Sequence, residues 1–184
     1  MARSAQPVKT GISFEDYLEF EKTAREKHEF VDGQLFMMAG ASDRHNRLSG
    51  RLYAQLLSTE VPPCRAFIAD MKVETPSGQG YYPDVLVVCD ETDDHPYVKK
   101  KPCLIIEVLS DSTEAIDRGE KLNNYRHFES LQAYLLVNQV TKRLELFRRN
   151  DDGSLRYDVF EEGDKVTLPC GDATISVDDL YANL

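Results

Sequence analysis

A carboxylate in the middle of an apolar run constrains the fold of this chain more than any other feature. Residues 103–113 read CLIIEVLSDST, and their length and β-branched content indicate a buried strand that carries Glu107. Burying an unpaired carboxylate is costly, so Glu107 needs a cationic partner, a proton or a metal ion. Which of these it has decides what the protein does.

The length and hydropathy of the chain predict one globular domain. Its 184 residues are enough to bury a core but too few for two domains of ordinary size. The hydrophobic fraction of 41% is that of a soluble protein, and no apolar run approaches the ~18 residues that a membrane span needs. The opening sequence MARSAQPVKTG lacks the apolar segment of a signal peptide, so we expect a cytoplasmic protein without a membrane partner.

The four cysteines are Cys64, Cys89, Cys103 and Cys170, and no two of them form a C-x-x-C pair. Three of them lie in or beside strand-like runs. This pattern favours the reduced, partly buried thiols of a cytosolic protein over disulfides or a zinc site.

The charge balance limits how the protein can meet nucleic acid. The chain has 22 basic and 32 acidic side chains, which gives a net charge of −10. Such a chain is not expected to coat nucleic acid non-specifically, because that binding depends on basic residues that meet phosphates. A nuclease is still compatible with this charge, since acidic side chains can hold metal ions.

Periodicity and turn residues predict an α/β or α+β domain over residues 13–184, preceded by a flexible arm over residues 1–12. Ser13 is a good N-cap for a helix that we expect to end near Lys27. The dipeptide Asp32-Gly33 predicts a hairpin turn. The other expected elements are a helix after Ser42, strands over 64–69, 72–75, 81–89 and around Glu107, a helix from about Ser112 or Thr113 to Phe128, a hairpin of 133–138 with 143–149, short strands near 155–160, 165–168 and 174–177, and a last helical turn over 178–181.

Two carboxylates are expected at neighbouring strands. Asp84 follows Pro83 and begins a strand, and strand ends are common places for functional sites. If this strand lies beside the strand of Glu107, the two carboxylates converge, and Mg²⁺ typically takes one or two carboxylates together with waters and phosphate. The alternative is a salt bridge between Glu107 and a nearby Lys or Arg, and the residues alone leave the two at about even odds.

Lys121 is expected on the inward face of the helix that follows Glu107. At about 100° per residue it lies within roughly 20° of Phe128 and 40° of Tyr125. It can therefore lean toward Glu107, either as a structural ion pair or as a catalytic lysine that orients a water and stabilises a phosphoryl transition state. Spacing alone favours the structural pair, and Asp117, one turn earlier, could simply hold the lysine.

His45 lies within about 20° of the apolar face of its helix, where a histidine is more often a hydrogen-bonded core residue than a base or ligand. Arg44, Arg47 and Arg51 are spaced three and four apart. They could form a phosphate-facing stripe, although a solvated helix face is the usual outcome for such spacing. The chain contains no nucleophile elbow, phosphate-binding loop, dinucleotide-binding motif or H-E-x-x-H motif.

Four blocks of the sequence, in this order, resemble the Uma family of restriction-endonuclease-like proteins within the PD-(D/E)XK nuclease superfamily. The blocks are HEFVDGQLFMMAGASDRHNRLSGRLY, YYPDVLVVCD, KPCLIIEVLSDSTEAIDRGEKLNNYR and LQAYLLVNQ. The resemblance runs from about Ser13 to the C-terminus. It implies a restriction-endonuclease-like fold, in which helices flank a central mixed sheet that carries a two-carboxylate metal site.

The resemblance also implies roles for individual residues. Asp84 matches the "PD" aspartate and Glu107 matches the "(D/E)" position, so both would bind Mg²⁺ or Mn²⁺. The lysine expected two positions later is Leu109 here, and Lys121 on the following helix fits the relocated lysine. Its inward face then favours the catalytic reading over the structural one.

Further matches extend this site. Glu29, which means little alone, matches an acidic residue of the first block and would be a third carboxylate. His45 matches the histidine of the "GAS-x-x-H" block and would assist metal or phosphate binding. Asp111 stands where relatives usually have proline, a change that bears on the entry of the helix more than on the metal.

The function implied is a metal-dependent endonuclease that hydrolyses phosphodiester bonds of nucleic acid, with DNA as the expected substrate. A homodimer is expected, because cutting two strands requires two sites. Two alternatives stay open: a catalytically silent nuclease-fold module that binds nucleic acid or a regulatory partner, and a structural domain in which Glu107 only pairs with Lys121.

Overall fold

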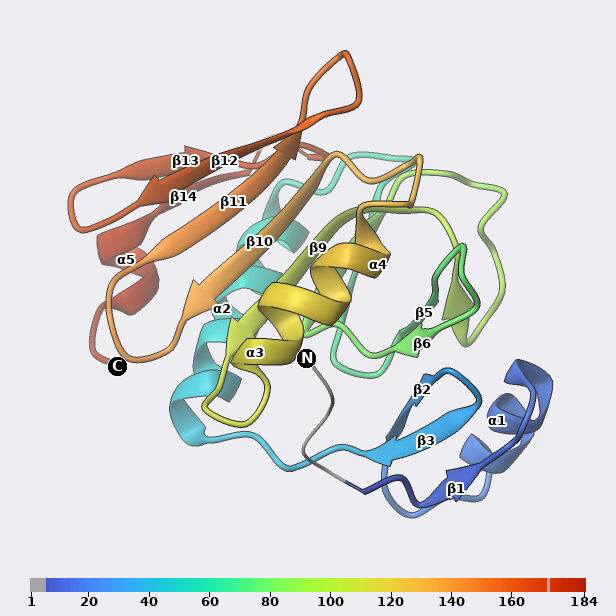
Figure 1. Ribbon diagram of the computed structural model, residues 1–184. Coiled ribbons are helices and arrows are strands. Elements are labelled where there is room, and N and C mark those ends of the chain that lie inside the picture. The colour runs from blue at the N-terminus through green and yellow to red at the C-terminus, as the bar shows by residue number, and fades with distance from the viewer. Residues whose placement is uncertain (1–5, 172) are drawn as a thin grey trace.

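A mixed six-stranded sheet forms the centre of the computed structural model, which describes residues 6–171 and 173–184 (Figure 1). Its strand order is β12-β11-β10-β9-β7-β4. The strand β9 pairs in parallel with β10 and antiparallel with β7, and the remaining pairs are antiparallel. The bounds are β4 Arg65–Ile68, β7 Val85–Val88, β9 Pro102–Leu109, β10 Ala133–Asn138, β11 Leu144–Arg149 and β12 Leu155–Phe160.

The side chains of β9 alternate between two cores, as the pleat of a strand requires. Leu104, Ile106 and Val108 join one hydrophobic cluster, and Ile105 and Leu109 join another on the opposite face. Because Glu107 lies between Ile106 and Val108, it shares the face of the second cluster. The two faces therefore differ: one is a wholly apolar core, and the other receives a buried charge.

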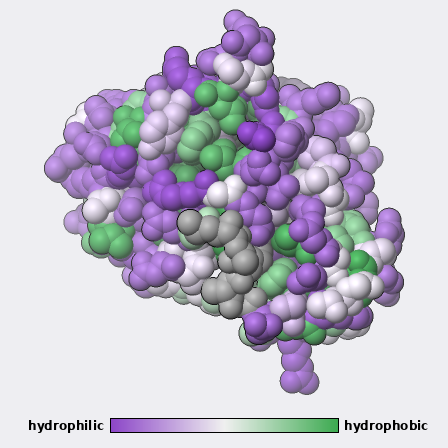
Figure 2. All heavy atoms as spheres, viewed as in Figure 1, coloured by the Kyte–Doolittle hydropathy of each residue, from purple (hydrophilic) through white to green (hydrophobic). Residues whose placement is uncertain are grey.

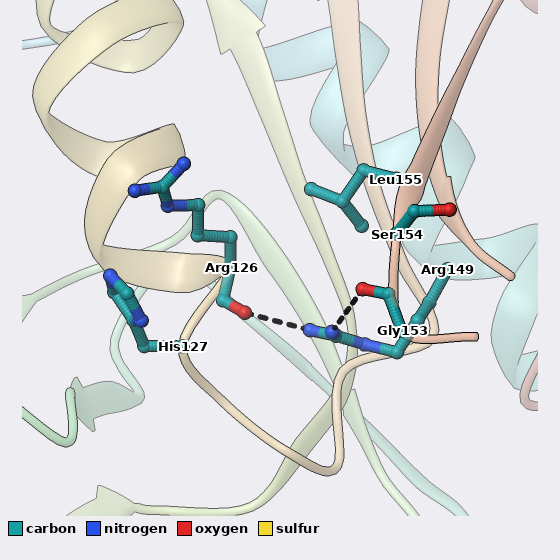
Figure 3. Close-up of a pocket in the computed structure, with 6 residues that line it drawn as sticks. All are labelled: Arg126, His127, Arg149, Gly153, Ser154 and Leu155. Carbon is teal, nitrogen blue, oxygen red and sulfur yellow. Dashed lines mark hydrogen bonds between the residues drawn. The ribbon is translucent and has the colours of Figure 1, made fainter. Parts of the chain in front are cut away.

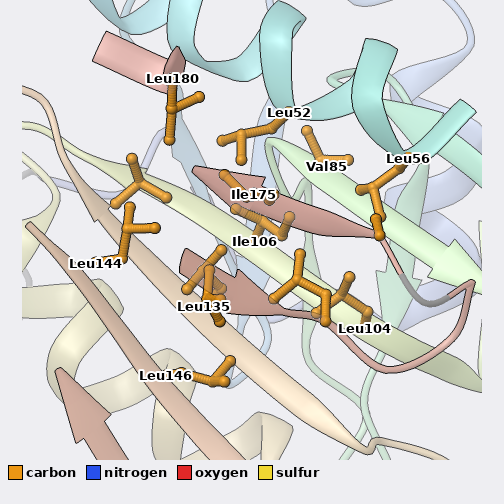
Figure 4. Close-up of a cluster of buried hydrophobic side chains, with 14 of the residues drawn as sticks. Leu52, Leu56, Val85, Leu104, Ile106, Leu135, Leu144, Leu146, Ile175 and Leu180 are labelled. Carbon is orange, nitrogen blue, oxygen red and sulfur yellow. The ribbon is translucent and has the colours of Figure 1, made fainter. Parts of the chain in front are cut away.

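Helix α2, Asp43–Ser58, covers the apolar face of the sheet (Figures 1 and 4). It begins where the Ser42 hydroxyl accepts a hydrogen bond from the His45 backbone N–H at 3.1 Å, a standard N-cap. Leu48, Leu52 and Leu56 are buried on its inner side, and each such burial contributes about 1.5–3 kcal/mol. The hairpin of β13, Lys165–Thr167, with β14, Thr174–Ser176, and helix α5, Val177–Tyr181, complete this core.

A short helical segment covers the other face of the central sheet (Figure 1). It consists of α3, Glu114–Ile116, a π-helical turn η1, Asp117–Lys121, and α4, Leu122–Tyr125. A π-helical turn inside a helix is rare and is frequent at functional sites. The predicted helix is confirmed, but its π-helical turn was not predicted.

A second six-stranded sheet packs beside this segment in the order β1-β3-β2-β6-β5-β8. Its strands are β1 Lys9–Thr10, β2 His28–Val31, β3 Gln34–Met37, β5 Lys72–Glu74, β6 Gly80–Tyr81 and β8 Val98–Lys99. The predicted hairpin at Asp32-Gly33 is confirmed, with φ of 49° and 74° at the two turn residues. Positive φ at both positions is what a tight hairpin turn requires.

Helix α1 spans Phe14–Glu21 and is shorter than predicted. The predicted extension to Lys27 is wrong. Its cap is the expected one, since the Ser13 side chain and the Asp16 side chain each bond the other's backbone N–H. Beyond Phe20 the sequence has no large apolar side chain before Phe30, so further turns would have little to bury, and packing rather than propensity stabilises most helices.

The N-terminal arm is only partly described. The predicted flexible arm over residues 1–12 is wrong for the strand β1, because Lys9 and Thr10 pair with Leu35 and Gln34 of β3. Residues 1–5 lie outside the described residues. The boundary of one domain at residue 13 stays a prediction.

The prediction of reduced thiols is also wrong for this structure, which joins Cys64 to Cys89 and Cys103 to Cys170 in disulfides. The register of β4 with β7 pairs Arg65 with Val88, and its continuation places the next residue of each strand, both cysteines, side by side. Strand pairing over such sequence distances is not visible in cysteine spacing.

The molecular surface is mostly hydrophilic on the face seen in Figure 2, with smaller hydrophobic groups between the polar side chains. None of the helices in the part of the chain that the structure describes has the length and apolar character to cross a membrane.

Candidate active site

Asp84 directly precedes β7, and Glu107 lies on the neighbouring strand β9. The register of β7 with β9 pairs Val85 with Ile106, and its continuation brings Asp84 opposite Glu107. Asp84 Oδ2 also accepts a hydrogen bond from the Val108 backbone N–H at 2.7 Å, which fixes its carboxylate beside β9. The Asp84 side chain is 21% exposed and that of Glu107 only 4%, so the pair runs from the surface into the interior.

Lys121 lies at the centre of a buried charge cluster. Its Nζ is 3.0 Å from Glu107 Oε1, 3.2 Å from Glu29 Oε1 and 2.9 Å from Asp117 Oδ1. All four side chains are at most 8% exposed. The predicted inward face of Lys121 is therefore confirmed, and its position on the π-helical turn places it between β2 of one sheet and β9 of the other.

Two tyrosines complete the cluster. The Tyr125 hydroxyl donates to Glu107 Oε1 at 3.1 Å, and the Tyr134 hydroxyl donates to the backbone carbonyl of Asp117 at 3.1 Å. Neither was among the predicted site residues. The signal for Tyr125 was its place one turn after Lys121 on the same inward face.

The cluster holds more carboxylates than cations. Burial lowers the pKa of Lys121, but the charges of Asp117, Glu107 and Glu29 raise it by more. The resulting pKa is well above the usual value of a lysine, so the ammonium stays charged. Burial raises the pKa of Glu107; Lys121 opposes this, whereas the charges of Asp117 and Asp84 add to it, and the net pKa is well above the usual value.

Burial also raises the pKa of Asp117, again against the opposing effect of Lys121. These shifts have a common meaning. One ammonium does not balance this many buried carboxylates, so Glu107 and Asp117 bind protons more readily than exposed carboxyl groups do.

His45, on helix α2, contacts the site. Its Nε2 lies 3.2 Å from Asp84 Oδ2, and its side chain is 14% exposed. Burial lowers the pKa of His45, but the hydrogen bond and charge of Asp84 and the carbonyl of Val108 together raise it above its usual value. The structure thus brings all five predicted residues, Asp84, Glu107, Lys121, Glu29 and His45, into one connected group.

The donor chemistry of this group fits a hard divalent cation. Hard cations take carboxylate oxygens, and Mg²⁺ commonly uses only one or two of them with waters and phosphate. The contacts described above involve Oδ2 of Asp84 and Oε1 of Glu107, and each carboxylate has a second oxygen. Among the described residues, the carboxylates and imidazole of this site do not form a group of three ligand atoms within 4.8 Å of one another, so a two-carboxylate site is the arrangement they suit.

The three arginines of helix α2 lie beside backbone carbonyls of other chain segments. Arg47 donates to the backbone carbonyl of Asn183 at 2.8 Å, and Arg51 donates to that of Leu180 at 2.7 Å. Arg44 lies 3.4 Å from the carbonyl of Val140. These contacts link α2 to the C-terminal segment and to the β10–β11 turn. Arg47 is exposed, as a solvated helix face predicts, and the phosphate-facing stripe stays a prediction.

A pocket of about 300 Å³ lies away from this cluster, between α4 and the β11–β12 turn (Figure 3). Its lining includes Arg126, His127 and Arg149. The Arg149 guanidinium donates to the backbone carbonyls of Arg126 at 2.8 Å and Gly153 at 3.2 Å. Because backbone carbonyls already accept hydrogen bonds from the Arg149 guanidinium, this side chain links two chain segments, and the pocket is less suited to bind an anion.

Comparison with known proteins agrees with this geometry. The Uma2 family, described as "Putative restriction endonuclease", matches residues 14–177. The chain belongs to the Uma2 family. "Uncharacterized protein slr1290" of Synechocystis is 38% identical over 176 residues, which cover 94% of this chain and 93% of that protein. "Uncharacterized protein sll1609" of the same organism is 38% identical over 143 residues, or 74% of this chain and 80% of that protein.

The Uma2 fold is also found in a solved structure. The crystal structure of a putative nuclease belonging to DUF820 from Anabaena variabilis matches with a TM-score of 0.73 and 19% identity, over 93% of this chain and 98% of that one. At this identity the match shows a shared fold. The predicted fold class, a mixed sheet flanked by helices in a restriction-endonuclease-like arrangement, is confirmed, and membership of the Uma2 family supports a nuclease.

Proposed function

We propose that this Uma2 protein is a metal-dependent endonuclease that hydrolyses phosphodiester bonds of DNA in the cytoplasm. The observation that carries the proposal is the excess of buried carboxylates around Lys121, next to Asp84 at the surface. An ion pair alone would not need a third and a fourth carboxylate. A divalent cation would offset their mutual repulsion.

Asp84 and Glu107 would hold Mg²⁺ or Mn²⁺. When bound, such an ion lowers the pKa of a water and shields charge that develops on a phosphate. Asp84 is suited to its part because the Val108 N–H fixes its carboxylate, so little reorganisation is needed on binding. Glu107 is fixed in the same way by the Tyr125 hydroxyl.

Lys121 would stabilise negative charge on the reacting phosphate and orient the attacking water. This is the role of the lysine that the sequence lacks at Leu109. Its ammonium stays charged, and Glu29 and Asp117 hold it in one position. Pre-positioned charge in a site closed to water is among the largest contributions to catalysis.

His45 would contribute positive charge at the exposed edge of the site, since Asp84 raises its pKa. Protonated, it would draw a phosphate toward Asp84 and Glu107. We also propose a homodimer, because cleavage of both strands of a duplex requires two such sites.

The test is a cleavage assay on supercoiled plasmid, linear duplex and single-stranded DNA, each with Mg²⁺, Mn²⁺ or EDTA. Wild type, Glu107→Gln and Glu162→Gln are purified identically. Glu162 is an exposed glutamate that pairs with Lys142, so its variant controls for the loss of one carboxylate. We expect metal-dependent cleavage by wild type and Glu162→Gln and its loss in Glu107→Gln.

Equal cleavage by wild type and Glu107→Gln would overturn the proposal, since it would come from a contaminant or another site. The second candidate is a catalytically silent nuclease-fold module that binds nucleic acid or a regulatory partner. Leu109 at the usual lysine position and the net charge of −10 favour it. DNA binding without cleavage, with Mn²⁺ bound by wild type, would support this second function.

A further inference from the structure

All four cysteines of the chain meet at one end of the central sheet. Cys64 directly precedes β4, Cys89 directly follows β7, and Cys103 is the second residue of β9. Because β7 pairs antiparallel with both β4 and β9, these three positions lie at the same end of the sheet. Cys170, in the turn between β13 and β14, reaches the same place through its bond to Cys103.

The sulfur atoms form a compact group. Those of Cys89, Cys103 and Cys170 lie within 4.8 Å of one another, and Cys64 is bonded to Cys89. Cys64, Cys89 and Cys170 are partly buried against the large apolar core, and Cys103 is half-buried. Among the described residues, these cysteines are also the one group of three or more possible metal ligands gathered so closely.

Once the two disulfides are reduced, four sulfurs gathered this closely can surround one tetrahedral metal ion. Zinc binds four cysteine sulfurs at about 2.3 Å, which places neighbouring sulfurs about 3.8 Å apart. Three sulfurs already lie within 4.8 Å of one another, and the fourth is adjacent. Ligands that come from distant parts of the sequence do not produce a C-x-x-C signature, so the sequence spacing did not reveal the group.

We propose that the reduced protein binds one Zn²⁺ through Cys64, Cys89, Cys103 and Cys170. A thiol reductant converts the two disulfides to four cysteine thiols and is itself oxidised to two disulfides. Zn²⁺ then binds four thiolates, and the four thiol protons are released to solvent. Reduced thiols are the normal state of cytosolic cysteines, so zinc would replace the two disulfides as the link in that compartment.

The role of this ion would be structural. Four protein ligands close the coordination sphere, as in structural zinc sites. The ion would tie the β13–β14 turn to the edge of β4, β7 and β9, on the apolar side of the sheet. The site is independent of Asp84 and Glu107, whose ligand atoms are oxygens and suit a harder cation.

The test is cobalt binding by the reduced, metal-free protein under anaerobic conditions. Co²⁺ held by four thiolates shows a thiolate-to-metal charge-transfer band and strong visible bands, both lost when Zn²⁺ displaces it. We expect one Co²⁺ per chain in wild type. In Cys103→Ser and Cys170→Ser we expect a loss of Co²⁺ affinity greater than the ~10–100-fold caused by changing a residue that only orients a ligand. Asp84→Asn should keep the thiolate bands, which separates this site from the carboxylates.

Alkylation of the wild type covers the case in which a cysteine variant fails to fold. We expect Zn²⁺ to protect the four thiols of the reduced protein from alkylation, and to restore structure if reduction has unfolded the chain. Absence of the charge-transfer band in reduced wild type, or equal alkylation with and without Zn²⁺, would overturn the proposal.

Discussion

Val108 donates its backbone N–H to the carboxylate of Asp84 at 2.7 Å. This bond joins the strand that carries Glu107 to the residue that directly precedes β7, and it leaves the two carboxylates side by side. Since the acceptor is charged and only partly exposed, the bond is stronger than one between neutral groups. The sheet register and one charge-assisted bond together fix the geometry of the candidate metal site.

Asp84→Asn should separate metal binding from folding. An amide oxygen can still accept the Val108 N–H, so we expect a loss of about 1 kcal/mol or less in the free energy of unfolding. The variant lacks the negative charge that a divalent cation requires, so Mn²⁺ affinity should fall by about tenfold or more. Calorimetric titration with Mn²⁺ and urea unfolding measure the two effects. Asp151→Asn, on an exposed turn, should change neither, and unchanged Mn²⁺ affinity in Asp84→Asn would exclude Asp84 as a ligand.

Lys121→Met should expose the electrostatic imbalance of the cluster. Removing the ammonium leaves Glu29, Glu107 and Asp117 without their shared cation, and breaking such a buried pair costs about 3–5 kcal/mol. The remaining carboxylates would have raised pKa values in the folded state. A carboxyl group of this kind destabilises the fold increasingly as the pH rises above its unfolded-state value, which is 4.5 for glutamate.

The stability deficit of Lys121→Met should therefore grow between about pH 5 and about pH 8, as urea unfolding at both values would show. Lys142→Met is the matched control. Its ammonium pairs with Glu162 and Asp178 at the surface, so we expect a loss below about 1 kcal/mol. A pH-independent deficit in Lys121→Met would mean that the lysine acts by packing alone.

The parts of the site that lie on regular elements could be predicted from the sequence. Pro83 indicated where a strand begins, so Asp84 was expected at the first position of that strand. The apolar run indicated that Glu107 lies inside the next strand. Helical spacing placed Lys121 inward, and this held in spite of the π-helical turn. These predictions rest on local periodicity, which a single sequence contains.

The rest depended on contacts between distant segments. Glu29 of β2 was expected in the site only from the family resemblance. Local periodicity did not indicate its contact with Lys121, because the packing of one sheet against the other decides it. The four cysteines were misread for the same reason. The order β9-β7-β4 brings Cys64, Cys89 and Cys103 together, and Cys170 joins them from the turn between β13 and β14. Helix α1 ended early because no large apolar residue after Phe20 gave further turns a surface to cover.

Glu145→Gln should reveal a stabilising network remote from the site. The Glu145 carboxylate accepts from Arg118 at 2.6 and 2.8 Å and from Tyr157 at 2.7 Å. The bond from Arg118 lowers its pKa to about 2, with burial opposing and Tyr157 and Arg143 assisting. A lowered pKa contributes stability that is present above the unfolded-state value of 4.5 and is lost as the pH falls toward 2.

We therefore expect Glu145→Gln to lose about 2 kcal/mol of unfolding free energy at neutral pH. The difference from wild type should shrink as the pH falls from 4.5 toward 2. Denaturant unfolding across that range measures it, with Glu26→Gln, an exposed glutamate, as the control. A difference that stays constant with pH would contradict the role of the charge.

Gly80→Ala tests the packing that supports Glu29. A Cβ at this position would lie 2.8 Å from the Tyr17 ring and 3.0 Å from the Phe14 ring. Both rings are side chains of helix α1, so relieving the clash requires a shift of the helix or of β6. We expect the free energy of unfolding to fall by about 1–3 kcal/mol. Since Gly80 pairs with Phe30 on β2, the residue next to Glu29, amide exchange along β2 should accelerate.

Gly50→Ala, the same type of substitution, is expected to stabilise the protein, whereas Gly80→Ala is expected to destabilise it. A Cβ there meets no atom within 4 Å, and alanine in the interior of helix α2 should raise the free energy of unfolding by about 0.5–1 kcal/mol. Urea unfolding of both variants decides the matter. If Gly80→Ala were as stable as wild type, α1 would pack less closely on the second sheet than the structure has it, and Glu29 would lose the rigid support that its contact with Lys121 requires.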